Sequence, residues 1–191
     1  MYIVGINGSH REQSNSELFL DYVLEKFQTD HEVEKINLLD KHIAFYDACD
    51  ACVQNKPCHI QDDMHSIFES LLKADVVIFS SPTYYGMPSA RLKNLMDRTD
   101  MFFASKQLQG KIGVVITNGA GTFAGIELNA KMVRHFFDDH KMVNIPVYAC
   151  FNNTKDYPEN RFPAPLSEKV RKMLDELYEN AVDIAEKIRN F

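Results

Sequence analysis

The run Val76-Val77-Ile78-Phe79 constrains the fold of this chain more than any other feature, because a strand of these residues has no face suited to water. Such a strand belongs in the middle of a parallel sheet whose two faces are covered by helices. Four further apolar runs, at residues 3–6, 33–38, 112–116 and 143–148, alternate with stretches of helical periodicity. We therefore expect an α/β protein with helices on both faces of the sheet.

The helical stretches lie at residues 15–27, 62–74, 90–103 and 126–140, with a break near Asp100. A closing helix follows a Ser167 cap and carries an apolar stripe from Val170 to Ile188. Five strands separated in this way predict a doubly wound five-stranded parallel sheet in the flavodoxin-like order 2-1-3-4-5. With 191 residues, residues 1–191 are expected to form a single domain.

Charge and hydropathy exclude two classes of partner. Lys and Arg number 21 against 27 Asp and Glu, a net charge of -6, and no basic patch suited to nucleic acid is apparent. Residues 1–6 carry no targeting pattern, and no run reaches the roughly 18 apolar residues of a membrane span. These features predict a soluble cytoplasmic protein with reduced cysteines.

Three loops follow the first, third and fourth predicted strands and are expected to meet at one sheet edge, where doubly wound folds bind ligands. The first loop is rich in hydroxyl and amide side chains and runs into a helix start, where backbone amides favour an anion. Its expected phosphate-binding residues are Ser9, Arg11, Ser14, Asn15 and Ser16. An ordinary turn with a Ser or Asn helix cap is the alternative.

Other phosphate-binding loops fit this segment less well. A Walker loop requires a Gly-Lys-Ser/Thr sequence, and the lysine is missing. Gly5-Ile6-Asn7-Gly8 lacks the third glycine of the dinucleotide fingerprint. The third strand is followed by Ser80-Ser81, which removes a phospho-accepting aspartate.

The loops after the third and fourth strands suit a planar ring. Tyrosine faces stack on heterocycles, and glycines let the backbone approach a ring edge. The residues expected to contact the ring are Pro82, Thr83, Tyr84, Tyr85, Gly86 and Met87 in one loop and Asn118, Gly119, Ala120 and Gly121 in the other. Taken singly, these loops could be a Pro/Gly turn and a loop without function. One phosphate site and one ring site at the same edge predict bound FMN.

Three motifs resemble those of the NAD(P)H-dependent FMN reductase family, in the branch of the iron–sulfur flavoproteins. They are Gly8-Ser9-x-Arg11-x-x-Ser14-Asn15-Ser16, Ser81-Pro82-Thr83-Tyr84-Tyr85-Gly86, and Cys49-x-x-Cys52-x5-Cys58 followed by Asp62-Asp63-Met64. The resemblance implies a flavodoxin-like fold, bound FMN, a homodimer or homotetramer, and two-electron transfer from a nicotinamide cofactor.

The expected function is that of an FMN-dependent oxidoreductase, with NAD(P)H as co-substrate and a small acceptor such as a quinone, a free flavin, or a nitro or azo compound. Because the cofactor carries the chemistry, no catalytic acid–base residue is expected. The alternative is a flavodoxin-like electron carrier or redox sensor without turnover of its own. A net charge of -6 is modest for a carrier that docks through an acidic surface.

The iron–sulfur flavoproteins that this chain resembles carry the cysteine pattern C-x2-C-x2-C-x5-C. The cysteine motif of this chain departs from that pattern at one position. Cys49, Cys52 and Cys58 match the last three positions, and Tyr46 stands at the first. Three thiolates with an open iron, or a Cys3His zinc site completed by His59, remain alternatives. The prediction is reduced thiols without metal, with Cys150 buried and inert.

Two segments raise questions of assembly. The stretch 90–104 carries Leu92, Leu95, Met96, Met101, Phe102 and Phe103, which favours a homodimer, unless the two phenylalanines fold back on the core. The segment 152–166 is too long for a simple connection. It is interpreted either as a cover over a neighbouring subunit's flavin or as a mobile loop on the protein surface.

Overall fold

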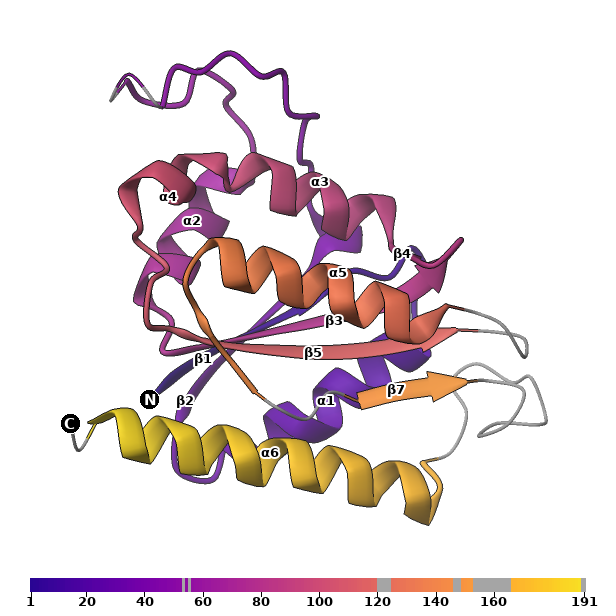
Figure 1. The fold of residues 1–191 in the computed structure, drawn as a ribbon. Coiled ribbons are helices and arrows are strands. Elements are labelled where there is room, and N and C mark those ends of the chain that lie inside the picture. The colour runs from indigo at the N-terminus through magenta and orange to yellow at the C-terminus, as the bar shows by residue number, and fades with distance from the viewer. Residues whose placement is uncertain (53, 55, 120–124, 146–148, 153–165, 190–191) are drawn as a thin grey trace.

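A computed structural model describes residues 1–52, 54, 56–119, 125–145, 149–152 and 166–189 (Figure 1). Its strands are β1 (Tyr2–Asn7), β2 (Glu32–Asn37), β3 (Val76–Tyr84), β4 (Met87–Pro88), β5 (Ile112–Gly119), β6 (Val143–Asn144) and β7 (Ala149–Asn152). Its helices are α1 (Asn15–Phe27), α2 (Met64–Lys73), α3 (Ala90–Arg98), α4 (Asp100–Ser105), α5 (Ile126–Asp139) and α6 (Glu168–Arg189), with a 3-10 turn, η1, at Leu38–Asp40.

The sheet has the order β2-β1-β3-β5-β6, and β7 also pairs with β5. All of these pairs are parallel, whereas β4 pairs antiparallel with β3. The hairpin strand β4 lies outside this order, so β5 is the predicted fourth strand, and β6 and β7 together take the place of the predicted fifth. The predicted flavodoxin-like order 2-1-3-4-5 is therefore confirmed. In the part of the chain that the structure describes, the sheet nevertheless has seven strands, not five.

Two predicted strands differ from the observed ones. A single strand at residues 143–148 was wrong: β6 ends at Asn144, residues 146–148 lie outside the described residues, and pairing with β5 resumes at Ala149. The sequence has Pro146 at this point, and proline has no amide hydrogen to donate to a ladder. The third strand is longer than predicted, because β3 continues past Phe79 to Tyr84.

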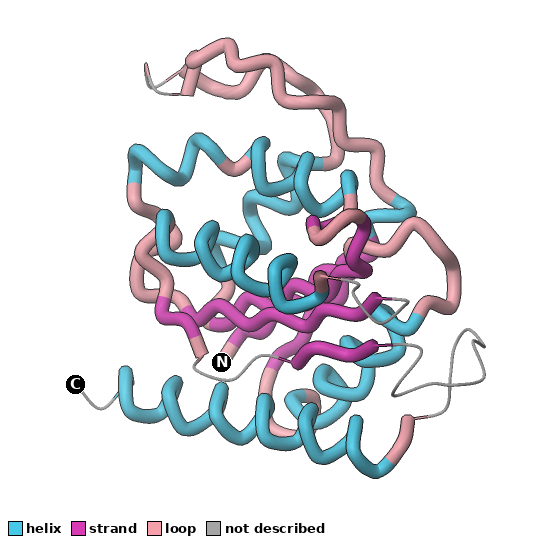
Figure 2. Tube along the Cα trace, turned by 45° about the vertical axis from the view of Figure 1, so that its right-hand side comes forward, coloured by secondary structure: helices cyan, strands magenta, loops and turns pink. Residues whose placement is uncertain are grey.

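Helices cover both faces of the sheet, so two apolar cores form (Figures 1 and 2). On one face α1 and α6 pack on the sheet, with the rings of Phe19 and Phe151 4.5 Å apart. On the other face α2, α3, α4 and α5 form the second core, where Phe79 and Phe137 lie 5.2 Å apart. The expected two-sided burial of the central strand is confirmed, since all four residues from Val76 to Phe79 are buried.

The helices follow the sequence pattern closely. The break near Asp100 separates α3 from α4 at Thr99, whose hydroxyl donates to the Met96 carbonyl at 2.6 Å. Ser167 caps α6 by accepting from the Val170 amide at 3.3 Å. None of the described helices is long and apolar enough to cross a membrane.

The apolar surface predicted at residues 90–104 is divided between the core and solvent. Leu92, Leu95 and Phe102 are buried within this chain, so Phe102 folds back on the core. Phe103 stays 55% exposed on α4. Residues 41–61 are here named the cysteine segment; its described part leaves the end of η1, passes beside α3 and α4, and extends beyond them on the side away from the sheet (Figure 1). Among its described residues, this segment contains no helix or strand.

Candidate functional site

The strand register brings the three predicted ligand-binding loops to one edge of the sheet. Asn7 of β1 pairs with Ser80 of β3, and Ser81 pairs with Thr117 of β5. The chain segments that follow these positions therefore start side by side, as the crevice of a doubly wound sheet requires. We name this place the carboxyl edge.

The first loop is held by its own polar side chains. The Gly8 amide donates to the Ser80 carbonyl at 2.8 Å, and the Ser9 amide donates to Asn7 Oδ1 at 3.1 Å. Ser14 caps α1 by accepting from the Glu17 amide at 3.2 Å. Four of the predicted phosphate residues, Ser9, Ser14, Asn15 and Ser16, are buried at this helix start, and Arg11 is exposed. The α1 N-terminus thus presents backbone amides and hydroxyl groups together, which is the arrangement that attracts an anion.

The second loop, predicted only as a loop after the third strand, is a β-hairpin. Thr83 and Tyr84 at the end of β3 pair with Pro88 and Met87 of β4. Tyr85 and Gly86 form the turn with φ of 53° and 78°, the positive values that two-residue type I′ turns need. Tyr85 is wholly exposed, and Tyr84 is 40% exposed. The hairpin therefore presents two tyrosine rings to solvent on a regular backbone frame.

The start of α5 supports this hairpin through residues that the sequence analysis missed. Buried Asn129 donates from Nδ2 to Thr83 Oγ1 at 2.9 Å and to the Pro82 carbonyl at 3.3 Å. A Cβ on Gly125 would lie 2.9 Å from Gly86 Cα, so only glycine allows this approach. The sequence contained one signal that could have identified Asn129. It is a polar residue on the apolar helix face that Ile126, Ala130 and Val133 define.

The third loop is linked to the first. Asn118 is buried and donates from Nδ2 to Ser16 Oγ at 2.6 Å. Gly119 ends β5, whereas the predicted residues Ala120 and Gly121 lie outside the described residues. Ser89 provides a second link, because its Oγ donates to the Gly8 carbonyl at 2.5 Å and its amide donates to Ser81 Oγ at 3.0 Å. The phosphate and ring segments are thus one connected unit.

His10 lies between these segments and was not predicted as a site residue. Its ring centroid is 6.0 Å from that of Tyr84, and its Nδ1 accepts from Arg91 Nε at 3.2 Å. Burial lowers the pKa of His10, and the nearby Arg91 charge lowers it further. The ring is therefore neutral at pH 7, with its proton on Nε2 because Nδ1 is an acceptor.

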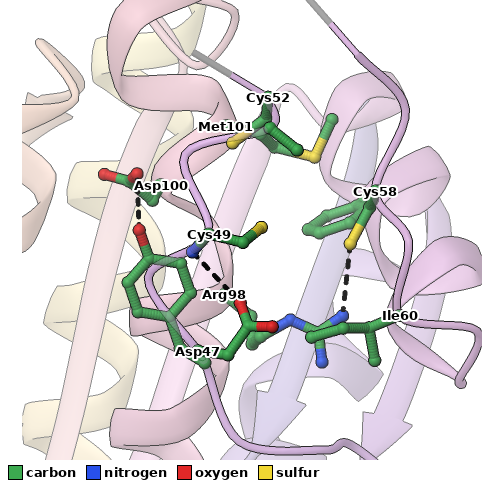
Figure 3. A pocket seen from close by; sticks show the side chains of 11 residues that line it. Asp47, Cys49, Cys52, Cys58, Ile60, Arg98, Asp100 and Met101 are labelled. Carbon is green, nitrogen blue, oxygen red and sulfur yellow. Dashed lines mark hydrogen bonds between the residues drawn. The ribbon is translucent and has the colours of Figure 1, made fainter. Parts of the chain in front are cut away.

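The three motif cysteines line a pocket on the cysteine segment (Figure 3). Cys58 Sγ accepts from Arg98 Nη2 at 3.8 Å, and Arg98 forms an ion pair with Asp62 at 2.6 Å in which both side chains are buried. Burial alone would raise the pKa of Asp62, but its hydrogen bond with Arg98, the Ala44 and Met64 amides and the Arg98 charge bring it below the usual value. Asp62 thus ties this segment to α3.

The donor set of this pocket does not fit a four-iron cluster, which needs four thiolates. Tyr46, at the first position of the motif, donates its hydroxyl to Asp100 Oδ2 at 3.0 Å. This hydrogen bond, with burial and the Asp100 charge, raises the pKa of Tyr46 to about 12. The phenol therefore stays protonated and is occupied elsewhere, and a guanidinium lines the space beside Cys58. The Cys150 side chain and residues 153–165 lie outside the described residues, so the predictions made for them stay untested.

This fold and edge define a flavodoxin-like α/β protein with a polar helix start beside an aromatic hairpin. The chain belongs to the NADPH-dependent FMN reductase family, whose sequence model matches residues 1–156. It is a flavoprotein of the oxidoreductase class, and the resemblance to the branch of iron–sulfur flavoproteins is confirmed.

Individual relatives agree with this assignment. An iron-sulfur flavoprotein of Methanocaldococcus jannaschii is 34% identical over 144 residues, which cover 75% of this chain and 75% of that protein. The structure of RosB with bound 8-demethyl-8-formylriboflavin-5'-phosphate superposes with a TM-score of 0.75 at 13% identity, covering 100% of this chain and 81% of RosB. A flavodoxin from the domain Archaea gives a TM-score of 0.62 at 16% identity, covering 99% of both chains. At these identities the two structures support the fold alone.

Proposed function

We propose that this chain oxidises NAD(P)H through bound FMN and passes the electrons to a small acceptor, such as a quinone, a free flavin, or a nitro or azo compound. One observation carries the proposal: a polar helix start and an exposed tyrosine hairpin share the carboxyl edge, and Ser89 joins them directly. A ligand with one phosphate and one planar ring matches both features at once. The family assignment supports the same chemistry.

The phosphate would lie at the start of α1. Ser9, Ser14, Asn15 and Ser16 are already fixed there, so little ordering of the loop is needed when an anion binds. Arg11 adds a positive charge from the same loop, and charge-assisted hydrogen bonds to phosphate are among the stronger ones in proteins. The helix dipole favours the same site.

The flavin ring would lie along the hairpin from Pro82 to Met87, with Thr83, Tyr84, Tyr85 and Gly86 between them. Tyr84 and Tyr85 offer exposed aromatic faces, and Met87, 47% exposed, offers a polarizable thioether. Asn118, Gly119, Ala120 and Gly121 would close the opposite side. Asn118 is well placed for this role because its hydrogen bond to Ser16 links ring and phosphate segments.

When bound, FMN supplies hydride acceptance and release. The chain's own residues bind the phosphate, orient the ring and keep the hairpin rigid through Asn129. No side chain is assigned as a catalytic acid or base. The binding energy and the orientation of the reactants are then the protein's contribution to the rate.

Steady-state oxidation of NADH and NADPH, followed with added FMN and a quinone, tests the proposal. We expect turnover that requires both flavin and acceptor. A flavodoxin-like electron carrier would bind FMN and leave the nicotinamide unconsumed, which would contradict the enzymatic proposal while keeping the flavin site. Protein that takes up no FMN at micromolar concentration would contradict both.

We also propose that the chain forms a homodimer or homotetramer through α3 and α4. Phe103 is the supporting residue, since it lies 55% exposed beside buried Phe102. Light scattering at micromolar concentration should give a multiple of the 22.0 kDa chain mass, and Phe103→Glu should shift it toward the monomer. Lys106→Glu, just after α4, is the control for added charge. A wild-type mass near 22.0 kDa would reject this assembly.

A further inference from the structure

Arg91 brings a fixed positive charge to the carboxyl edge. It is the second residue of α3, and two hydrogen bonds hold its guanidinium: Nε donates to His10 Nδ1 at 3.2 Å, and Nη1 donates to the Leu38 carbonyl at 2.9 Å. His10 lies in the loop after β1, and Leu38 begins the η1 turn after β2. The guanidinium therefore joins the ends of two neighbouring strands.

Most of the donor capacity of Arg91 is unused. An arginine has five N–H donors in a planar fork, and the two hydrogen bonds above occupy two of them. Among the residues that the structure describes, no carboxylate forms an ion pair with Arg91, whereas Lys93 and Arg98 of the same helix each have an aspartate partner. A half-buried guanidinium with unused donors suits a phosphate, because the fork matches two phosphate oxygens.

His10 holds this guanidinium close to the proposed flavin site. Its neutral ring accepts from Arg91 through Nδ1, so it orients the guanidinium without adding a second charge. The same ring lies 6.0 Å from the ring of Tyr84 on the hairpin. Arg91 is thus separated from the hairpin by a single side chain, within reach of a second ligand that lies against the flavin.

The phosphate of FMN has a different place along this edge. Its proposed residues lie at the start of α1, which covers one face of the sheet, whereas α3 covers the other face (Figure 1). Ser16 is tied to Asn118 at the end of β5, but Arg91 reaches Leu38 on the β2 side of β1. FMN bound at α1 and the hairpin would therefore leave the Arg91 fork for another anion.

We propose that Arg91 binds the 2′-phosphate of NADPH and so selects NADPH over NADH, with His10 as the residue that positions the guanidinium. This inference rests on the proposed function, because it names the co-substrate of the same site. NADPH differs from NADH only in that phosphate. An arginine accommodates the 2′-phosphate of NADP in dinucleotide-binding α/β folds as well. The nicotinamide would lie at the hairpin, and the adenosine end would extend past His10 toward η1.

The first measurement is the binding of adenosine 2′,5′-bisphosphate and adenosine 5′-monophosphate to the full chain with FMN added, by isothermal titration calorimetry. The two probes differ only in the 2′-phosphate, and neither is oxidised or reduced. The bisphosphate should bind wild type about tenfold more tightly, and Arg91→Gln should remove this difference, because a charge-assisted hydrogen bond is lost. Lys93→Gln removes a charge from the same helix, and as the matched control it should keep the difference.

Two variants test the positioning role of His10. His10→Asn keeps an acceptor near the place of Nδ1 and should retain most of the bisphosphate affinity. His10→Ala removes the acceptor and should weaken bisphosphate binding several-fold, because the guanidinium is no longer held before the ligand arrives. Equal losses in the two variants would overturn this role.

Steady-state kinetics gives the second measurement. Arg91→Gln should raise the KM for NADPH about tenfold with kcat unchanged, and leave the KM for NADH as in wild type. Equal binding of the two probes by wild type, or the same loss in Lys93→Gln, would overturn the proposal. So would weaker binding of FMN but not of riboflavin to Arg91→Gln, since the phosphate at Arg91 would then be that of FMN. Probes that bind as expected without oxidation of either nucleotide would support the Arg91 site and contradict the proposed function alone.

Discussion

The carboxyl edge and the cysteine segment both collect residues that are distant in sequence, but they do so by different means. At the carboxyl edge, the hydrogen-bonded register of the strands determines which residues lie next to each other, as in the pairs Asn7–Ser80 and Ser81–Thr117. The cysteine segment has no helix or strand among its described residues, and the side chains of Asp62, Asn94 and Arg98 hold it through its backbone at residues 43 and 44. The edge is therefore a property of the fold, whereas the cysteine pocket depends on a few pairs.

This difference predicts where single substitutions do most damage. Strand pairing distributes stability over many backbone hydrogen bonds, so one lost side-chain contact at the edge should alter ligand binding more than folding. A buried ion pair concentrates stability, because removal of one partner leaves an uncompensated charge. The predictions below test this contrast, from the largest effect to the smallest.

The largest expected effect is the loss of Asp62. In the ion pair, the side chain of Asp62 is 1% exposed and that of Arg98 is 2% exposed. Asp62→Ala therefore leaves a buried guanidinium without its carboxylate partner. The free energy of unfolding should fall by about 3–5 kcal/mol, measured by urea denaturation. Asp63→Ala, at the neighbouring and more exposed carboxylate, should cost about 1 kcal/mol or less. Equal losses in the two variants would show that the pair does not anchor the segment.

Asn129→Ala should affect ligand binding and stability together, but less severely. The variant leaves the Pro82 carbonyl and Thr83 hydroxyl without the donor that fixes the hairpin. We expect the unfolding free energy to fall by about 1–2 kcal/mol and FMN to bind about tenfold more weakly. Asn180→Ala is the control and should change neither quantity, because Asn180 lies on α6 and its Nδ2 donates to the Glu176 carbonyl of the same helix. Unchanged FMN affinity in Asn129→Ala would separate the hairpin from the flavin site.

Tyr85→Gly should separate stability from binding. Tyr85 has a φ of 53° and no burial, so glycine relieves strain and should raise the unfolding free energy by up to about 1 kcal/mol. FMN affinity should fall several-fold through the lost ring contact. Lys106→Gly, at a φ of 56° after α4, should give the same stability change with unaltered FMN binding. A parallel change in FMN affinity in both variants would contradict a role for the Tyr85 ring.

The smallest expected effect is on acid sensitivity. Because Asp62 has a lower pKa folded than unfolded, the folded chain binds fewer protons at acid pH, and this stabilisation is lost as the pH falls below about 4. Wild type should therefore lose stability more steeply below that pH than Asp62→Asn, whose side chain does not titrate. Chemical denaturation at pH 3 to 6 measures the two slopes. Identical slopes would mean that Asp62 is not held ionised by Arg98.

The fold could be predicted because its signals are local and repeated. The doubly apolar run at residues 76–79 indicated the central strand, and the Ser167 cap marked the start of the closing helix. Strand order then placed the three loops at one edge without any side-chain detail. Where local signals were ambiguous, prediction failed: the hairpin at residues 83–88 looked like a Pro/Gly loop, and the fifth strand was divided.

Contacts between distant elements could not be predicted. Asn129 supports the hairpin from one turn inside α5, and the Asp62–Arg98 pair joins two segments that composition alone does not connect. The group of Asp47, Cys49 and His59 is a similar case, because His59 lies twelve positions after Asp47 and ten after Cys49, and the three share no periodic element. Their meeting depends on the folded path of the cysteine segment.

The most direct test of the account compares the affinities of FMN and riboflavin for the flavin-free chain by fluorescence titration. If the α1 start and the hairpin act on one ligand, one FMN per chain should bind, and riboflavin should bind at least about a hundredfold more weakly, because it lacks the phosphate that charge-assisted hydrogen bonds would hold. Equal affinities, or no binding of either flavin at micromolar concentration, would contradict a joint phosphate and ring site at the carboxyl edge.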